Sequence, residues 1–451
     1  MATLTRLTGW GRTAPTQALV RPVASERAVI DAVRDAPARG VLARGLGRAY
    51  GDAAQNSGGL VLDMTSLDGA PDGDGGVIEV SAGTSLDRLI RELLPSGRFP
   101  AVVPGTRHVT IGGAIAADIH GKNHHRDGSF CDHVESIVLL TPTGERLVVK
   151  QGDDAFEATA GGMGLTGVIA SARLRVTTLE TAFMTVDTER ASDLDDLLSR
   201  LRATDADHRY SVAWIDCLAR GRSLGRAVLM RGDHARRDDL RASQRTAPLV
   251  PPPSALLTAP PWVPQGLLNR ATVRAFNEAY FRRAPVAEHG RVQPLPAFFF
   301  PLDAIRGWNR LYGARGFLQY QCLVPFGAEE TVRKLLERLS AAGAPSFLAV
   351  LKAMGPGRGL LSFPGPGWTL ALDVPALPSL APLLDELDEL VAAASGRIYL
   401  AKDSRLRPDL VAAMYPELPR WEEIRARLDP DRVMRSDLAR RLALTVDQGP
   451  R

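Results

Sequence analysis

Cysteine is scarce in this chain. Cys131, Cys217 and Cys322 are the only three among 451 residues, and no two of them form a C-x-x-C pair. A small, odd number of cysteines without metal-ligand spacing excludes a disulfide-stapled fold and is typical of reduced thiols. We expect these three to be buried small apolar residues.

Long apolar runs are also missing. No stretch reaches the roughly 20 consecutive apolar residues that span a bilayer, and the first residues lack the roughly 7 to 15 apolar residues of a secretory signal. The sequence predicts no signal peptide and no spanning helix. We expect a protein that is cytoplasmic or peripherally associated with a membrane.

Lysine is rare, because only five of the 55 basic residues are lysine: Lys122, Lys150, Lys334, Lys352 and Lys402. Where arginine is the default, each remaining lysine is a candidate for a role that needs a compact ammonium group. The net charge of +4 is spread along the chain without basic runs. This pattern excludes a nucleic-acid binder, which needs a basic stripe.

The chain is otherwise of ordinary globular composition. Hydrophobic residues make up 45% and charged residues 24%, which favours a protein folded around apolar cores. The length suggests two or three structural units, and no internal repeat is present.

Short apolar and amphipathic segments alternate through the first 180 residues. We predict helices over residues 26–33 and 85–94, the second capped by Thr84 or Ser85. The strands expected in this part cover residues 40–43, 59–63, 77–80, 135–141, 145–149 and 168–176.

The pattern changes after about residue 180. A proline-rich segment over residues 251–264 predicts an extended connection. Strands are expected at 298–300, 316–325, within 359–373 and at 397–405, with a helix at 329–342. Helices after residue 414 could return to the first unit.

Three loops rich in small residues are candidates for cofactor binding. The first, residues 44–52, can form a concave nest of backbone N–H groups that binds phosphate, although a structural turn explains it equally well. It is not a dinucleotide fingerprint, because Tyr50 stands where the third glycine is required. Together with residues 110–117 and 161–167 it suggests a long, flat cofactor with a pyrophosphate.

Four of the eight histidines, His120, His124, His125 and His133, fall in one stretch. No H-E-x-x-H or C-x-x-C spacing completes a zinc site, so we expect no metal. The absence of G-x-S-x-G argues against a serine hydrolase. His120 and Lys122 either face a cofactor or anionic substrate or belong to a polar loop. The same two interpretations apply to Lys402, Gln319 and Gln321: their polar groups either face a ligand or are satisfied locally.

Seven segments together resemble a known family. They are TRLTGWGRTAP, ARGLGRAYGD, PGTRHVTIGGAIAADIHGKNHH, GGMGLTG, GFLQYQ, LSFPGPGW and YLAKDSR, in this order from Thr5 onward. In sequence and spacing they are similar to the decaprenylphosphoryl-β-D-ribose 2′-oxidases, FAD enzymes of the vanillyl-alcohol-oxidase (PCMH) type. The similarity extends to about Leu444.

The resemblance implies an α+β fold of two domains. An FAD-binding PCMH-type domain would take residues 1–180, a substrate domain on an antiparallel sheet residues 181–396, and a C-terminal return to the FAD domain residues 397–451. The FAD contacts implied are Ala43, Arg44, Gly45, Leu46, Gly47, Arg48, Ala49, Tyr50, Gly51, Asp52, Ala53, Gly105, Thr110, Ile111, Gly112, Gly113, Ala117, Asp118, Ile119, His120, Ile169 and Tyr399.

On the substrate side the resemblance implies Lys122, Trp214, Gln319, Gln321, Lys352, Ala371 and Lys402. Lys402, Tyr399 and His120 would be catalytic, with His120 a candidate proton acceptor. The reaction implied is oxidation of the 2′-hydroxyl of a polyprenyl-phosphoryl-β-D-ribose to a 2′-ketone, the first half of an epimerisation that makes an arabinose donor for the cell wall. The alternatives are an FAD oxidase of a free sugar, aldonolactone or other alcohol, and a non-catalytic flavin scaffold.

Two departures from relatives carry consequences. Residues 44–52 contain no histidine that could tether the flavin, so we expect non-covalent FAD. Mycobacterial members have cysteine at the position of Ala371, where nitroaromatic inhibitors attach, and asparagine at the position of Thr369. Covalent capture should therefore fail here, and the fit of the sugar pocket is altered.

The resemblance also implies partners. These are the polyprenyl-phosphate-linked ribose, a short-chain-type NADH-dependent keto-reductase subunit and a peripheral contact with the membrane, with the cell-envelope side implied by the family. Residues 255–268 offer Leu256, Leu257, Trp262, Val263, Leu267 and Leu268 for interfacial docking. A plain mobile loop is the alternative.

Overall fold

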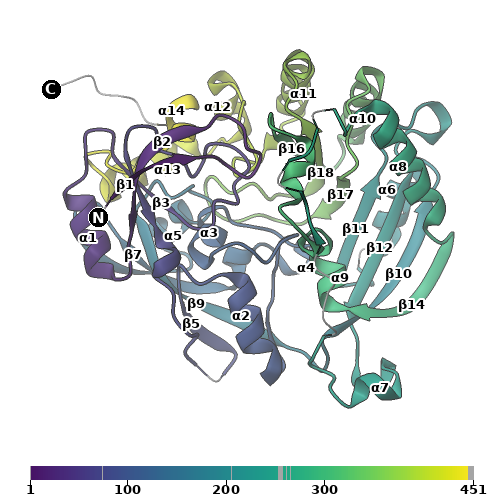
Figure 1. Cartoon of the computed structure of the whole chain (residues 1–451), viewed down its shortest axis with the longest axis horizontal. Helices are drawn as coiled ribbons and strands as arrows, with labels where there is room; N and C mark the ends of the chain where they lie inside the picture. Colours follow the sequence, from purple (N-terminus) through teal and green to yellow (C-terminus); the bar gives the residue numbers. More distant parts are fainter. Residues whose placement is uncertain are drawn as a thin grey trace.

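The computed structural model describes residues 2–73, 75–204, 206–251, 257–260, 262–264 and 266–444. Figure 1 shows two halves side by side: the N-terminal segments and the C-terminal helices form one, and a broad sheet with its helices forms the other. This mixture of helices with largely antiparallel sheets confirms the α+β class.

Two sheets build the first half. One has the order β1-β2-β4-β3, in which β4 pairs in parallel with both β2 and β3. The other is antiparallel, with the order β5-β9-β7-β8 and with β6 also on β9. Their strands are β1 (Thr3–Leu7), β2 (Thr16–Pro22), β3 (Val41–Arg44), β4 (Leu60–Asp63), β5 (Val77–Ser81), β6 (Arg98–Pro100), β7 (Val134–Leu140), β8 (Arg146–Lys150) and β9 (Val168–Thr178).

The helices of this half begin where the sequence provides caps. The Ser25 hydroxyl accepts a hydrogen bond from the amide of Ala28, and that of Ser85 accepts one from Arg88, both at 3.2 Å. Ser85, rather than Thr84, is therefore the cap of the second helix. The helices are α1 (Glu26–Arg34), α2 (Leu86–Leu93), α3 (Ile111–Ala116), α4 (His124–Asp127) and α5 (Asp154–Thr159).

The second half is one antiparallel sheet of eight strands, in the order β14-β10-β12-β11-β17-β18-β16-β19. Its strands are β10 (Phe183–Ala191), β11 (Tyr210–Ile215), β12 (Ala227–His234), β14 (Ala287–Pro294), β16 (Phe317–Pro325), β17 (Ala349–Met354), β18 (Gly367–Pro375) and β19 (Arg397–Ile398). A two-residue parallel pair, β13 (Leu257–Thr258) with β15 (Ile305–Arg306), lies outside it.

Helices pack on this sheet through apolar stripes. In α10 (Glu329–Ala342) the buried residues Val332, Leu335, Leu336 and Leu339 recur at helical spacing, and Gly343 ends the helix at φ +68°. The other helices here are α6 (Leu194–Thr204), α7 (Ala242–Arg245), α8 (Arg270–Arg283), α9 (Leu295–Phe299) and α11 (Ala381–Ala393).

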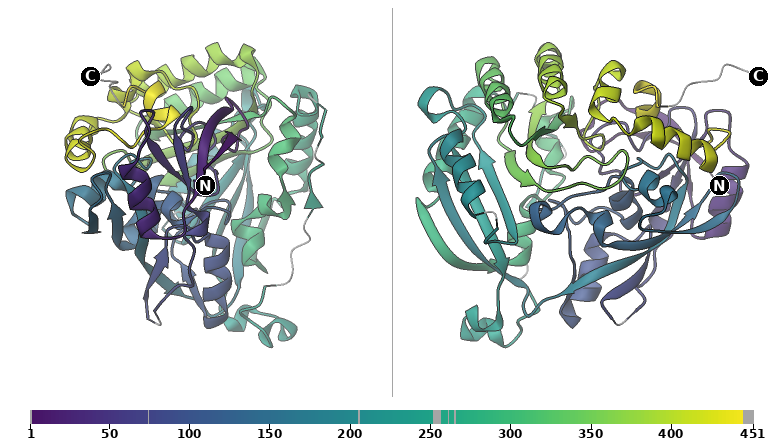
Figure 2. Two further views of the ribbon diagram at one scale, coloured as in Figure 1. Left: turned by 60° about the vertical axis from the view of Figure 1, so that its left-hand side comes forward. Right: turned by 180° about the vertical axis from the view of Figure 1, so that it is seen from behind.

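The C-terminal helices α12 (Val411–Met414), α13 (Leu418–Leu428) and α14 (Asp437–Arg441) return to the first half. Figure 2 shows them, in yellow, beside the purple and blue N-terminal elements. Trp421 donates to the carbonyl of Ala158 at 2.9 Å, and the buried Arg425 guanidinium donates to the carbonyl of Leu165 at 3.0 Å. The described C-terminal helices thus pack on the first half, and the domain boundaries stay a prediction.

Two predicted strands are wrong. Residues 298–300 belong largely to α9, because Pro296 starts a helix and a short, fully buried aromatic run has no periodicity that separates strand from helix. Of residues 397–405 only Arg397–Ile398 is a strand, and the rest forms a hydrogen-bonded turn in which Lys402 donates its amide to the Tyr399 carbonyl.

Two further expectations concern the cysteines and membrane-spanning helices. Cys131, Cys217 and Cys322 are all buried and free, as predicted. Within the described ranges, no helix has the length and apolar character needed to cross a membrane.

Candidate functional site

A cavity of about 420 Å³ lies where the two halves meet. This volume is in the usual range for a small-molecule site. The loops that follow β3 and β6, together with α3, form one wall, and strands β11, β16, β17 and β18 form the other. The turn that follows β19 joins the two walls through Tyr399 and Lys402.

The first wall is built from small residues. Ala43, Gly45, Gly112 and Gly113 leave backbone, rather than side chains, against the open space. A methyl group on Gly45 would lie 2.1 Å from the Thr110 hydroxyl, so the two loops touch there and only glycine fits. The result is a slot suited to a flat ligand.

Arg44 and Arg48 line the cavity and stabilise this wall through their contacts with neighbouring segments. The Arg44 guanidinium donates to the carbonyls of Ala54 at 2.7 Å and Thr8 at 2.8 Å. That of Arg48 lies 3.8 Å from the ring centroid of Trp10, a cation–π contact. Both arginines hold the loop in place.

Most residues predicted to contact FAD line this cavity. They are Ala43, Arg44, Gly45, Leu46, Gly47, Arg48, Ala49, Tyr50, Ala53, Gly105, Thr110, Gly112, Gly113, Ala117, Ile119, His120, Ile169 and Tyr399. Four others do not line it: Gly51, Asp52, Ile111 and Asp118.

Three of these four support the wall from outside. Ile111 is fully buried in the core beneath α3. Gly51 packs on the backbone of Asp403, where a methyl group would lie 2.0 Å from the carbonyl oxygen. Asp52 binds the guanidinium of Arg441, which also contacts Asp403 at 2.8 Å. This ion pair ties the first glycine-rich loop to the turn that carries Lys402.

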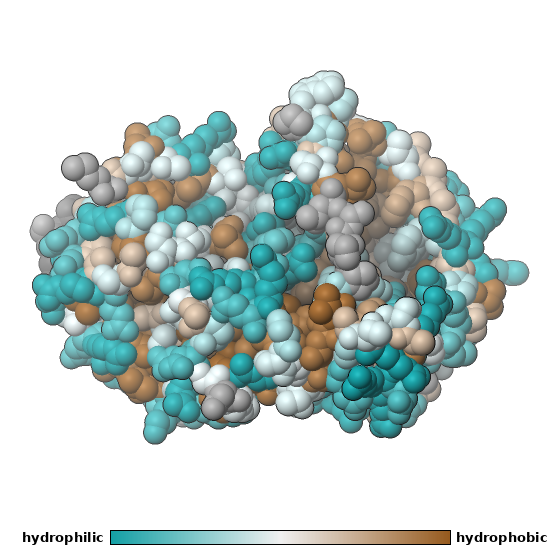
Figure 3. All heavy atoms as spheres, turned by 60° about the horizontal axis from the view of Figure 1, so that its bottom comes forward, coloured by the Kyte–Doolittle hydropathy of each residue, from teal (hydrophilic) through white to brown (hydrophobic). Residues whose placement is uncertain are grey.

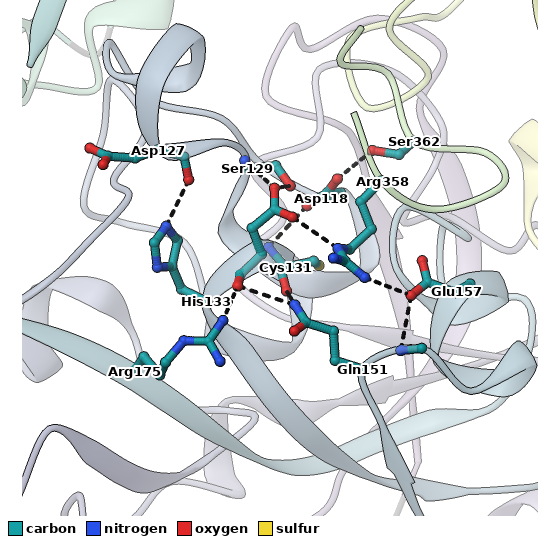
Figure 4. A network of polar contacts seen from close by, with 12 residues as sticks. Asp118, Asp127, Ser129, Cys131, His133, Gln151, Glu157, Arg175, Arg358 and Ser362 are labelled. Atoms are coloured by element: carbon teal, nitrogen blue, oxygen red, sulfur yellow. Dashed lines mark hydrogen bonds and ion pairs between the residues drawn. The ribbon is translucent and has the colours of Figure 1, made fainter. Parts of the chain in front are cut away.

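Asp118 belongs to a polar network behind the cavity (Figure 4). Its carboxylate accepts hydrogen bonds from the Ser362 hydroxyl and from the Cys131 amide, and burial raises the pKa of Asp118. Nearby, Arg358 bridges Asp132 and Glu157. The network fastens the β17–β18 connection to the first half.

The second wall presents polar side chains from strands. On β16, Gln319 and Gln321 stand directly opposite Asp373 and Ala371 of β18. Because alternate residues of a strand share a face, all four belong to one face of the sheet. Trp214, Gln319, Gln321, Lys352 and Ala371, which are predicted to bind substrate, line the cavity.

Three of the five lysines converge on this cavity: Lys122, Lys352 and Lys402. The Lys122 ammonium donates to the Phe298 carbonyl, and that of Lys352 donates to the Gly121 carbonyl at 3.3 Å. The ammonium of Lys402 lies 3.9 Å from the ring centroid of Tyr50. Such a concentration of half-buried positive charge favours an anionic ligand.

Desolvation lowers the pKa of all three lysines. It lowers the pKa of Lys122 to about 7 and that of Lys352 to about 8. Burial lowers the pKa of Lys402 to about 7, against the opposing effect of the Asp373 carboxylate. All three lose charge more readily than a surface lysine, so an anion in the cavity would restore their charge.

His120 lies among these groups. The Gln321 carboxamide donates to its Nε2 at 2.9 Å, and its Nδ1 is buried without a hydrogen-bond partner among the described residues. Burial holds the pKa of His120 well below its ordinary value, so the ring is neutral at pH 7. The hydroxyl of Tyr399 donates to the Ala117 carbonyl at 2.7 Å.

Sequence reasoning missed several groups. Trp10, Trp308 and Tyr280 line the cavity, and the buried Asp373 lies behind Gln319. Trp308 and Tyr280 belong to segments without a motif, whereas Trp10 lies in the segment TRLTGWGRTAP but was assigned no role. Asp373 could have been noticed as a charged residue that interrupts an apolar strand, WTLALDV.

The histidine-rich stretch forms no metal site. Among the residues that the structure describes, no group of three or more histidine, cysteine, aspartate or glutamate side chains is arranged to hold an ion. His124 instead accepts a hydrogen bond from the Gly355 amide at 3.1 Å, and His133 contacts the Asp127 carbonyl at 2.9 Å.

Comparisons with known proteins place this cavity in context. Residues 16–150 match the FAD binding domain family, and residues 376–442 match the D-arabinono-1,4-lactone oxidase family. The chain is 44% identical to a decaprenylphosphoryl-β-D-ribose oxidase of Mycolicibacterium smegmatis, over 98% of both chains.

Other relatives are less informative or more distant. An uncharacterised protein of Streptomyces coelicolor is 43% identical over 80% of this chain and all of its own length. Cytokinin dehydrogenase 2 of Arabidopsis thaliana is 28% identical over 30% of this chain and 27% of its own length.

The cavity fits the FAD that these matches imply. The matched domain contains the small-residue wall, and Gly105 faces open space in which an added methyl group would meet no protein atom. FAD is the cofactor, and the α+β fold is that of a PCMH-type FAD enzyme. By its 44% identity over almost the full length of both proteins, this chain belongs to the decaprenylphosphoryl-β-D-ribose oxidase family of FAD-binding oxidoreductases.

Proposed function

We propose that this protein uses FAD to oxidise the 2′-hydroxyl of a polyprenyl-phosphoryl-β-D-ribose to the 2′-ketone. The observation that carries this proposal is the pairing, in one cavity, of a small-residue slot with the three half-buried lysines Lys122, Lys352 and Lys402. The slot suits the cofactor, and the lysines suit a phosphate-linked sugar. The Mycolicibacterium smegmatis relative is a decaprenylphosphoryl-β-D-ribose oxidase, which agrees with this chemistry.

Lys122 and Lys352 are the proposed phosphate ligands. Both are half-buried, and each ammonium has a backbone carbonyl as its partner. Those single neutral acceptors leave donor capacity for phosphate oxygens, since an ammonium has three N–H donors. Charge-assisted hydrogen bonds to phosphate are among the stronger polar contacts in proteins.

Lys402, Tyr399 and His120 are the proposed catalytic residues. FAD, when bound, supplies the acceptor for the hydride that leaves C2′. The Lys402 ammonium would stabilise negative charge on the reacting oxygen. Because Nε2 of neutral His120 accepts from Gln321, the ring proton lies on Nδ1, which has no partner among the described residues, and His120 would accept a proton at Nε2 in place of that hydrogen bond. Tyr399 would hold the cofactor-side backbone at Ala117.

We propose that FAD is held without a covalent bond by the residues of the first wall and by Tyr399. Among the described residues lining the cavity, His120 is the one histidine, and it is engaged with Gln321. Heat or acid precipitation of the yellow protein should therefore leave free FAD in the supernatant. Flavin that stays with the precipitate would contradict non-covalent binding.

The division into domains follows the same reasoning. We assign residues 1–180 and 397–451 to the FAD domain and residues 181–396 to the substrate domain. The sheets support this proposal, since the eight-stranded sheet draws seven of its strands from within 181–396 and only β19 from the C-terminal part.

An oxidase of a free sugar, aldonolactone or other alcohol is the alternative. The match of residues 376–442 to the D-arabinono-1,4-lactone oxidase family favours it. The two proposals differ in whether the phosphate, and thus Lys122 and Lys352, are needed.

The deciding experiment is anaerobic mixing of the purified yellow protein with polyprenyl-phosphoryl-ribose, with ribose and with an aldonolactone. We expect the flavin absorbance to bleach only with the phosphorylated lipid sugar. Bleaching by the unphosphorylated compounds at similar concentration would favour the alternative. No bleaching with any of them would contradict both proposals.

The polyprenyl chain also needs a path to a membrane, and we propose that the segment around α8 docks at the lipid surface. Exposed apolar side chains gather in this part of the sequence: Leu257, Trp262, Leu267 and Phe276. The face drawn in Figure 3 is hollowed on its right-hand side, and hydrophobic atoms border the hollow. Val263 is buried and Leu268 packs in an aromatic cluster, whereas Ala255 and Leu256 lie outside the described residues.

Vesicle co-sedimentation tests this docking. Replacing Trp262, Leu267 and Phe276 by serine should reduce binding to anionic vesicles, because the apolar area available to the interface is lost. Equal binding of the variant and the original protein would contradict docking by this segment.

A keto product requires a second enzyme for epimerisation. We propose a short-chain-type NADH-dependent keto-reductase as the partner, because the ketone must accept a hydride on the opposite face to yield the arabinose configuration. Adding such a reductase and NADH to the oxidase reaction should yield the arabinose epimer.

A further inference from the structure

Asp373 is a buried carboxylate that the function proposed above does not use. It lies on β18, is fully inaccessible to solvent, and is two residues from Ala371 on the same face of the sheet. Its Oδ1 accepts a hydrogen bond from the Gln319 carboxamide at 2.5 Å. Its Oδ2 is buried without a partner among the described residues. An isolated buried carboxylate is costly unless a nearby charge compensates it.

The nearest source of compensation is Lys402. Within the described ranges the Lys402 ammonium has no hydrogen bond or ion pair, and it lies 3.9 Å from the ring centroid of Tyr50. Tyr50 in turn hydrogen-bonds Gln319, the residue that donates to Asp373. Asp373 and Lys402 act on each other electrostatically, and each opposes the effect of burial on the other. A half-buried cation and a buried anion are thus connected through Tyr50 and Gln319.

We propose that Asp373 is a positioning residue of the cavity: its carboxylate fixes the carboxamide of Gln319 and keeps the Lys402 side chain protonated. Asp373 acts through these two residues and lines no part of the cavity itself. This inference rests on the proposed function, because it concerns the group that stabilises the reacting oxygen.

Other titratable groups face the same pair. Tyr50 and Tyr312 are buried beside Asp373, and burial together with its charge raises the pKa of both phenols, so they stay neutral. Lys352 and His120 also interact electrostatically with Lys402. The positive charge of Lys352 opposes protonation of Lys402. Asp373 is therefore the one negative charge that acts on Lys402 among these neighbours.

The pair makes a prediction about pH. Burial raises the pKa of Asp373 to about 7 and lowers that of Lys402 to about 7, so both change charge in the same range and must be treated as a pair. The ammonium is present below the pKa of Lys402 and is lost as pH rises through it. Removing the negative charge at 373 lowers that pKa further, so the loss of reaction rate moves to lower pH.

The experiment is the pH dependence of the limiting rate of flavin reduction, measured anaerobically in the FAD-loaded protein at saturating polyprenyl-phosphoryl-ribose. Asp373→Asn keeps the size of the side chain and an oxygen that can accept from Gln319. We expect the high-pH midpoint to shift down by about one unit, the separation typical of coupled groups. A general loss of rate at every pH with an unchanged midpoint would overturn the proposal.

Asp388→Asn is the matched control. Asp388 is a carboxylate on α11 that is also buried, and burial raises its pKa to about 7 as well, but it pairs with Arg405 at 2.9 Å and lines no part of the cavity. This variant should keep the midpoint of the original protein. An equal shift in both variants would overturn the proposal, since any buried carboxylate would then produce it.

A second variant guards against failure of Asp373→Asn to fold. Gln319→Leu removes the donor to Asp373, favours the neutral carboxyl and should shift the midpoint in the same direction by a smaller amount. If the midpoint stays fixed in Gln319→Leu, the proposal is overturned. Absence of flavin reduction in the original protein would instead contradict the proposed function and is seen before any variant is compared.

Discussion

The two walls of the cavity are built by opposite means. On the FAD side, Gly45, Gly105, Gly112 and Ala117 make the site by withholding side chains, so the backbone itself forms the surface. On the sheet side, Lys352, Gln319 and Gln321 make the site by projecting polar side chains from strands. The first wall takes its specificity from shape, and the second takes it from charge.

Because the two walls are built differently, they should be sensitive to different substitutions. Adding a single methyl group to the first wall should displace a cofactor, while removing a single ammonium from the second should impair the handling of substrate. Lys402 stands at the junction, because its turn is tied to the first glycine-rich loop through Asp403, Arg441 and Asp52. Variants at the junction should have the largest effects.

Lys402→Ala gives the largest expected effect. Loss of the ammonium should slow flavin reduction by about 10²- to 10³-fold, the cost of removing one donor that stabilises a developing oxyanion. FAD should remain bound, because the small-residue wall is intact. Anaerobic stopped-flow absorbance measures the rate, with the exposed Lys334 of α10 replaced by alanine as the control. An almost normal rate of flavin reduction would contradict the proposed catalytic role of Lys402.

Lys352→Met tests the charged wall. Loss of a charge-assisted hydrogen bond to phosphate should raise KM for polyprenyl-phosphoryl-ribose about 10- to 100-fold, while kcat changes little. In the original protein KM should be lowest near pH 6 and rise as pH passes 7 to 8, because Lys122 and Lys352 lose their charge there. Steady-state kinetics against pH measure both effects. A pH-independent KM would contradict phosphate binding by these lysines.

Gly45→Ala tests the uncharged wall. The methyl group would lie 2.1 Å from the Thr110 hydroxyl, which accepts a hydrogen bond from Gly113 and so cannot move freely. Overpacking of this kind costs about 1–3 kcal/mol, so FAD affinity should fall about tenfold or more. Titration of the apoprotein with FAD measures it. Gly76→Ala, at a position where the methyl group meets no atom, is the control.

Ala371→Cys should have the smallest effect on turnover. The side chain is small and lies on the cavity surface, so kcat should stay within about threefold of the original value. The variant would carry the one cavity thiol among the described residues, since Cys131, Cys217 and Cys322 line no part of it. Mass spectrometry should find covalent capture by a nitroaromatic inhibitor in the variant alone. Capture by the original protein would contradict this.

The small-residue loops of the first wall could be noticed in the sequence, whereas their FAD contacts were implied by the resemblance and stay a prediction. The residues of this wall are adjacent in the chain, at 43–53 and 110–120, and glycine in such loops reports directly on close approach by backbone or ligand. The exceptions were the residues that face outward from the same loops. Gly51 and Asp52 continue the motif but turn toward Asp403 and Arg441, a direction that no local pattern encodes.

The sheet wall was identified by resemblance rather than by pattern. Gln319, Lys352 and Ala371 lie on three strands far apart in sequence, and their juxtaposition depends on register. Asp373 escaped notice for this reason, because its partner Gln319 is 54 residues away. Residues 298–300 were misassigned because burial on all sides leaves no period to detect.

The α+β class was implied by the resemblance to a known family. The amino-acid sequence by itself determined the small-residue loops and the scarcity of lysine, which marked Lys122, Lys150, Lys334, Lys352 and Lys402 as candidates. These are properties of composition and of contacts between near neighbours in the chain. Only the tertiary structure decided which of them share a cavity and how burial alters their charge. The physical reason is that the pKa of a lysine depends on its distance from water and from other charges, and both are set by strands and loops that meet only in the folded chain.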